Sequence, residues 1–151
     1  MSLGALLLAL HVLGAMVWVG GMVFGLVVLR PGMAFLEPPL RLALHKQVSA
    51  RFFHLLWYVM PAMLLTGIAL QYLFYGGILP SPWPVQLMTA TGLAMAAVFI
   101  AMVRGPWRDL RRALAANRTM EAGEAVQRLR RLTMVNLGIG LLTTIVAMLD
   151  Y

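Results

Sequence analysis

The segment LGALLLALHVLGAMVWVGGMVFGLVVL, residues 3–29, carries no charged residue. A helix that crosses a bilayer needs about 20 apolar residues, so this segment predicts a transmembrane helix. At 100° per residue, seven of its positions fall within an arc of roughly 100°. They are Gly4, Leu7, His11, Gly14, Trp18, Gly21 and Gly25. Small residues favour close helix packing and an imidazole in hydrocarbon is costly, so we expect this face to point into a bundle where His11 has a partner.

The composition of the whole chain predicts an integral membrane protein. Its residues are 62% hydrophobic and 11% charged, with a mean hydropathy of +0.86, whereas about a quarter of the residues of a soluble domain are charged. The absence of cysteine excludes disulfides and thiolate metal sites. The net charge of +7 comes from residues between apolar stretches, without interleaved base-stacking aromatics, so we do not expect nucleic-acid binding.

Four stretches are long enough to span a membrane: residues 3–29, 52–74, 85–103 and 132–149. We therefore expect one all-α domain, residues 1–151, folded as a four-helix bundle in the inner (plasma) membrane. All 12 Lys and Arg residues lie in residues 30–51 and 104–131. The positive-inside rule places these loops in the cytoplasm and both termini outside, and anionic lipid headgroups are the expected partners of the loops.

The loops themselves carry local signals. Pro31, Pro38 and Pro39 are expected to break the exit from the first span, and residues 40–51 fit an amphipathic helix that continues into the second. The third loop fits helical extensions of spans three and four, with Trp107 at the membrane interface. Residues 21–25 can also serve a homo-oligomer contact, because they carry glycine at both ends.

His11 is expected roughly 12 Å below the outer end of the first span. The same level on the other spans contains several thioethers and hydroxyls, among them Met63, Thr66, Met88, Met95 and Thr143. Thioether and imidazole ligands suit Cu(I), so His11, Met63, Met88 and Met95 are candidate metal ligands.

Two other interpretations of His11 stay open. Met also fills apolar cores, and His11 can be satisfied by a hydroxyl such as that of Thr66 or Thr143 in a membrane scaffold without a cofactor. If the protein binds haem b, His11 is one axial ligand and Met63 or Met95 the other. The glycines of the first span then make room for the macrocycle.

The remaining polar residues suggest less. Arg51, His54 and Asn136 are expected to form a secondary polar cluster near the cytoplasmic end, and His45 is expected to be an exposed loop histidine. The sequence has no phosphate-binding glycine loop, no His-Glu-x-x-His and no nucleophile elbow, and none of the four spans contains a carboxylate, Asp150 following directly after the last. We expect a binding or transport protein rather than an enzyme, or, failing that, a haem-dependent membrane oxidoreductase.

The stretch LHVLGAMVWVGG, residues 10–21, followed by Leu29-Arg30-Pro31, resembles the opening helix of the copper resistance D (CopD) family. Arg51-Phe52-Phe53 before Leu65-Thr66-Gly67, and the arginine-rich segment before Asn136, extend the resemblance over nearly the whole chain. It implies a four-helix inner-membrane protein that binds copper for uptake or tolerance. The cofactor-binding residues would then include His11, Trp18, Gly14 and Thr66.

The chain also resembles the HemJ-type protoporphyrinogen oxidases. These share its length, a Leu-His pair on span one, and a Pro-Ala-Met element like Pro61-Ala62-Met63. This second resemblance implies haem linked to His11, and with it electron transfer or porphyrinogen oxidation. Copper and haem both remain candidate cofactors.

Overall fold

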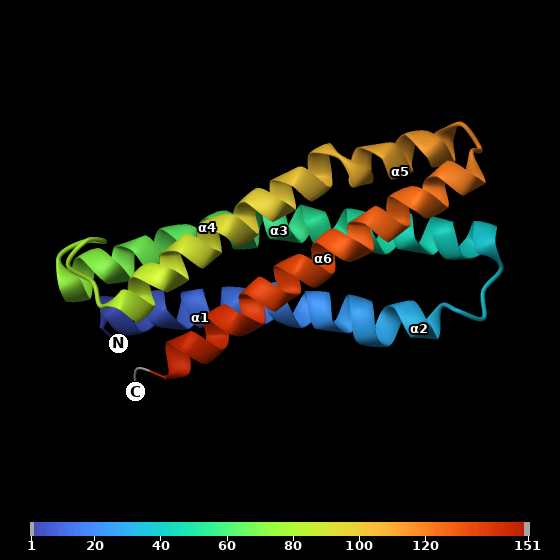
Figure 1. Cartoon of the computed structure of the whole chain (residues 1–151). Helices are drawn as coiled ribbons and strands as arrows, with labels where there is room; N and C mark the ends of the chain where they lie inside the picture. The colour runs from blue at the N-terminus through green and yellow to red at the C-terminus, as the bar shows by residue number, and fades with distance from the viewer. Residues whose placement is uncertain (1, 150–151) are drawn as a thin grey trace.

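The computed structural model of the chain describes residues 2–149, and its elements over that range are all helices, without a strand, as the predicted all-α fold requires (Figure 1). The first span comprises α1 (Leu3–Val23), a π-helical segment η1 (Phe24–Leu29) and the short α2 (Arg30–Gly32). The second lies within α3 (Pro38–Tyr75) and the third within α4 (Trp83–Arg104). A short α5 (Pro106–Ala115) leads to α6 (Thr119–Met148), which contains the fourth span. Asp150 lies outside the described residues.

Several helix ends follow directly from the local sequence. The Ser2 hydroxyl accepts a hydrogen bond from the Ala5 amide at 3.2 Å and so caps α1. Proline occupies the first turn of α3, α4 and α5, where its missing N–H costs nothing. At the other end of α3, Gly76 adopts a left-handed conformation with φ of 78°.

The exit from the first span differs from the expectation at Pro31. This proline does not end the helix, which continues to Gly32; the break comes at Met33, whose amide bonds back to Leu29 O at 3.0 Å and Arg30 O at 3.2 Å. The π-helical segment ends directly before Arg30. Because Pro31 has no N–H to donate, the helical hydrogen-bond ladder is already altered there, and the wider turns lie beside that alteration.

The helices pack as two pairs that lie against each other. The principal partner of α1 is α3, and α6 packs along α4 and α5. The amphipathic helix predicted for residues 40–51 is the first part of α3, which runs without interruption into the second span. The helical extensions predicted for the third loop are also confirmed, as α5 and the start of α6.

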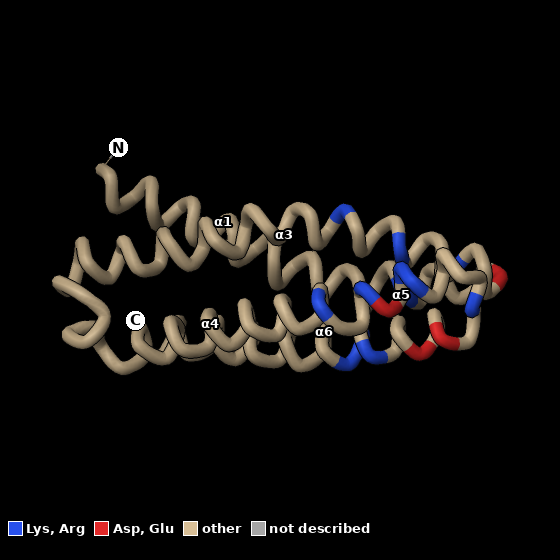
Figure 2. The backbone as a smooth tube through the Cα atoms, turned by 90° about the horizontal axis from the view of Figure 1, so that it is seen from above, with Lys and Arg blue, Asp and Glu red and all other residues tan. Residues whose placement is uncertain are grey.

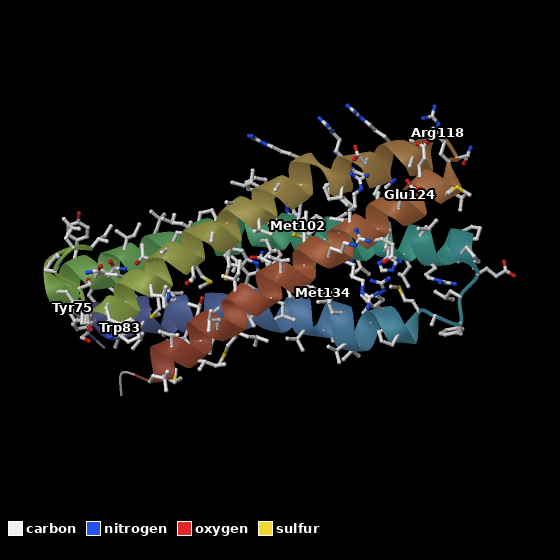
Figure 3. All side chains as sticks on the ribbon, viewed as in Figure 1. Tyr75, Trp83, Met102, Arg118, Glu124 and Met134 are labelled. Atoms are coloured by element: carbon white, nitrogen blue, oxygen red, sulfur yellow. The ribbon has the colours of Figure 1, made fainter. Side chains whose placement is uncertain are left out.

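Charge separates the two ends of the bundle. The charged residues of the described chain gather at one end, and both termini lie at the other (Figure 2). Tyr75 and Trp83 lie at the end with the termini, whereas Arg118 and Glu124 lie at the charged end (Figure 3). The two basic loops therefore lie at the opposite end of the bundle from the turn between α3 and α4, as predicted.

Aromatic residues form the centre of the core. Phe99 is 1% exposed and packs edge-on against Trp18, Phe53 and Trp57, with ring centroids 5.3–6.5 Å apart. Trp107, which follows the third span, is buried, with its ring 5.2 Å from that of Phe53. The reason is that α6 folds back along α5 and α4 (Figure 1), so the apolar face of α5 is packed against the bundle.

The outer surface of the spans is apolar. Large side chains such as Leu13, Met16, Leu65 and Ile145 are more than half exposed. Four helices are long and apolar enough to cross a membrane, and exposed apolar side chains around them fit contact with lipid tails.

Candidate functional site

The face of α1 that carries the glycines packs on α3. A Cβ atom built on Gly14 would lie 2.5 Å from Met63 Cγ, and one built on Gly21 would clash with the Phe52 ring. In return, a Cβ built on Gly67 of α3 would lie 3.0 Å from His11 Cε1. Glycine on both helices therefore permits this close approach. The predicted packing face is confirmed at Gly14 and Gly21, whereas a Cβ built on Gly25 meets no atom within 4 Å.

His11 has the partner expected of an imidazole in the membrane. Its Nδ1 lies 3.0 Å from Met63 O and 3.2 Å from Thr66 Oγ1. The Thr66 hydroxyl donates to Ala62 O at 2.7 Å. Because a carbonyl oxygen only accepts, His11 Nδ1 must carry the proton in this arrangement. Nε2 then keeps a free lone pair, which is the tautomer that binds a metal through Nε2.

Two of the other candidate ligands differ in their distance from His11. The Met63 side chain covers Gly14, with Sδ 3.4 Å from the position of its absent Cβ, one turn from His11 on the same face of α1. The thioether of Met95 instead packs between α4, Gly140 of α6 and Val19. Val19 lies about 12 Å further along α1 than His11. The structure therefore brings His11 together with Met63 and Thr66, whereas Met95 lies deeper in the bundle.

Met88 stands two turns before Met95 on α4, so it lies about 10 Å nearer the end that holds the termini. That rise brings Met88 to about the level of His11, and its side chain is half-buried. Among the described residues, no group of three His, Cys, Asp or Glu side chains could hold a metal ion. A metal at His11 would thus depend on thioether or oxygen ligands.

Trp18 and Asn136 are both buried with an unsatisfied polar atom. Trp18 is 2% and Asn136 1% exposed. The Asn136 amide donates to Met95 O at 3.3 Å, but within residues 2–149 its Oδ1 and the Trp18 Nε1 have no hydrogen-bond partner. Both residues line the same cavity of about 210 Å³ in the centre of the bundle.

The polar cluster expected from Arg51, His54 and Asn136 is not assembled. Within the described chain Asn136 bonds to Met95 on α4, whereas the side chains of Arg51 and His54 are exposed and His54 packs beside Tyr58. The expectation assigned them to one level of the bundle but could not tell which faces of α3 and α6 meet. His45 also differs, because it is half-buried and lines two cavities rather than standing exposed in a loop.

One buried polar contact was not anticipated. Gln71 of α3 is 5% exposed and donates a hydrogen bond to the Thr89 hydroxyl of α4. A glutamine in an otherwise apolar span is the signal that could have identified it, since a buried amide in a membrane needs a partner. It ties the two helices together near their connecting turn.

A family model for copper resistance protein D matches residues 46–149. The matched segment includes Met63, Thr66, Met88 and Met95, while His11 on α1 precedes it. Neither the curated proteins nor the solved structures gave a match. The match covers more than half of the chain. The four long apolar helices of the chain agree with a multi-pass inner-membrane protein. The chain therefore belongs to the copper resistance protein D family.

Proposed function

We propose that this protein binds Cu(I) at His11, with the thioether of Met63 as a neighbouring ligand, in copper uptake or tolerance. The observation that carries this proposal is the contact of His11 Nδ1 with Met63 O at 3.0 Å, since it leaves Nε2 free as a ligand. Imidazole and thioether are ligands that suit Cu(I). Family membership supports copper as the metal.

The surrounding residues support this role in different ways. Thr66 orients the ring through Nδ1, and Gly14 gives Met63 its place beside α1. Met88 is at the level of His11, and Met95 and Met102 follow at intervals of two turns along α4. We infer that Met88 is the candidate ligand from α4, and that Met95 and Met102 offer later thioether positions for a Cu(I) ion moving along the bundle.

The charged end of the bundle is assigned to the cytoplasm in this proposal. Basic loops are retained on that side during insertion, and the 12 Lys and Arg residues all precede or follow spans at that end. His11 then lies in the outer half of the membrane. That position is accessible to copper arriving from outside.

The test is Cu(I) binding by the detergent-purified protein, measured by competition with a chromophoric Cu(I) chelator. His11→Ala and Met63→Leu should each weaken binding by about tenfold or more. Two matched controls should bind as the wild type does: His54→Ala, an exposed histidine of α3, and Met16→Leu, which is 64% exposed on α1. Equal losses in the controls would contradict a site at His11.

An absorption spectrum of the same sample separates copper from haem. A Soret band that His11→Ala abolishes would identify His11 as an axial haem ligand and overturn the copper proposal. If His11→Ala changes thermal stability but neither metal nor haem content, the histidine serves helix packing. A copper-loaded, colourless wild type is the expected result.

A further inference from the structure

Two cavities adjoin at the charged end of the bundle. The outer one, of about 410 Å³, lies between α2, the start of α3 and α6. The inner one, of about 210 Å³, continues toward the centre of the bundle. The residues that line both are Leu26, Arg30, His45, Val126 and Arg130.

The outer cavity is cationic without a compensating acid. Arg30, Arg41, His45 and Arg130 line it, and none of its lining residues is Asp or Glu. Within the described residues, the ion pairs made by arginine involve Arg118 and Arg128, not these. Like charges that converge on one hollow repel each other, and an anion between them relieves that repulsion.

The side chain of Arg41 is held in place rather than free in solvent. Arg41 donates from Nη2 to Leu36 O at 3.0 Å, and its buried Nε has no hydrogen-bond partner within the described chain. Arg30 and Arg130 both line the two cavities, so their like charges converge there. A buried, unpartnered guanidinium nitrogen is costly, so an acceptor in the outer cavity would stabilise the site.

The inner cavity is lined mainly by apolar side chains, with Asn136 and Thr133 among its polar residues, and extends the outer one toward the middle of the bundle. Its walls include the side chains of Trp18, Met22, Phe52, Leu56 and Phe99. Gly25 of the π-helical segment also lines it, and a Cβ built there would meet no atom within 4 Å. The bundle is therefore open next to this glycine, at a depth where the surroundings are hydrocarbon.

We propose that the two cavities together bind one anionic phospholipid. Its phosphate lies among Arg30, Arg41 and Arg130, and part of one acyl chain occupies the inner cavity. Arg30 ends the apolar stretch of the first span, which is where lipid headgroups lie. A free phosphate would satisfy the arginines but would leave the adjoining apolar cavity unexplained. Arg30 lies about 28 Å along the helix from His11, and His11 lines neither cavity, so this inference does not rest on the copper proposal.

Leucine substitutions at two glycines of the same helix test the acyl-chain part. Gly25→Leu should fill the inner cavity, while Gly20→Leu is the matched control, because Gly20 also has no atom within 4 Å of its built Cβ but does not line the cavity. We would measure dioleoylphosphatidylglycerol and dioleoylphosphatidylcholine bound to the detergent-purified protein by native mass spectrometry. The wild type and Gly20→Leu should retain one phosphatidylglycerol, and Gly25→Leu should bind it about tenfold more weakly.

Glutamine substitutions test the headgroup part. Arg30→Gln with Arg130→Gln should weaken phosphatidylglycerol binding by about tenfold or more, since charge-assisted hydrogen bonds are lost. Arg108→Gln with Arg112→Gln removes the same charge from exposed positions of α5 outside the cavities and should have little effect. The site would be overturned if both double variants lost phosphatidylglycerol binding equally. It would also be overturned if the wild type bound phosphatidylcholine as strongly as phosphatidylglycerol. Displacement of the lipid by equimolar inorganic phosphate would overturn the lipid as its occupant.

Discussion

Replacing Gly67 with alanine should separate the copper site from the stability of the fold. A Cβ at this position would lie 3.0 Å from His11 Cε1 and 3.4 Å from Nδ1, so the ring must move by a few tenths of an ångström. The Nδ1 to Met63 O distance of 3.0 Å would then exceed about 3.2 Å, the upper end of the usual range. Losing such an orienting contact weakens metal affinity by about 10- to 100-fold, or roughly 1.4–2.7 kcal/mol.

Stability should change much less, because two effects oppose each other. Overpacking at the ring costs about 1–3 kcal/mol, whereas alanine favours the helix over glycine by about 1 kcal/mol. The assays are Cu(I) competition with a chromophoric chelator and thermal unfolding in the same detergent. Gly138→Ala is the control, since a Cβ there meets nothing within 4 Å. If His11→Ala no longer binds Cu(I) but Gly67→Ala binds it with unchanged affinity, the hydrogen bond of His11 Nδ1 does not organise the site, and the reasoning is refuted.

Three further predictions follow from the packing and the charges. Gly21→Leu should lower the thermal midpoint through its clash with the Phe52 ring, at a cost of about 1–3 kcal/mol, and an unchanged midpoint would contradict the tight seam. Asn136→Leu should raise stability by about 1 kcal/mol, because the lost hydrogen bond contributes less than the unpartnered buried Oδ1 costs; a lowered midpoint would indicate a bound water or ligand there. His45 lies on the basic part of α3, before its apolar stretch, and burial together with the positive charges of nearby arginines lowers its pKa. An anion would favour its protonated form, so phosphatidylglycerol binding should strengthen as the pH falls from 8 to 5.5, and His45→Gln should abolish this dependence.

The α1–α3 interface is the part of the site that the sequence predicts best. Helical periodicity alone places His11 and the glycines on one face, and the cost of a polar group in hydrocarbon requires a partner for the imidazole. Thr66 follows because it is a hydroxyl at the right level of the next span. These inferences depend on local geometry and solvation, which the sequence encodes directly.

The position of Met95 relative to His11 could not be obtained in the same way. Counting residues from the ends of the spans gives a depth, but it assumes straight helices of equal tilt. The helix α6 crosses the bundle obliquely (Figure 1). The position of the Met95 side chain is set by its contacts with Gly140 of α6 and Val19 of α1, which residue counting does not include. His45 was misplaced for a related reason: a loop of basic residues looked solvated, yet α3 is continuous there and turns His45 toward α2 and α6.

The π-helical segment explains why one stripe of glycines serves two purposes. The 100° step that defines the stripe holds through Gly21, whose missing side chain admits Phe52 of α3. From Phe24 the chain makes π-type turns, which hold more residues than α-turns, so the periodicity that aligned the earlier glycines no longer applies. Gly21 and Gly25 both line the inner cavity, but a Cβ built on Gly25 meets no atom within 4 Å, so Gly25 lies outside the helix seam. The first helix thus packs tightly around His11 and opens near Arg30, and the proposed copper ligands His11 and Met63 line neither of the two cavities.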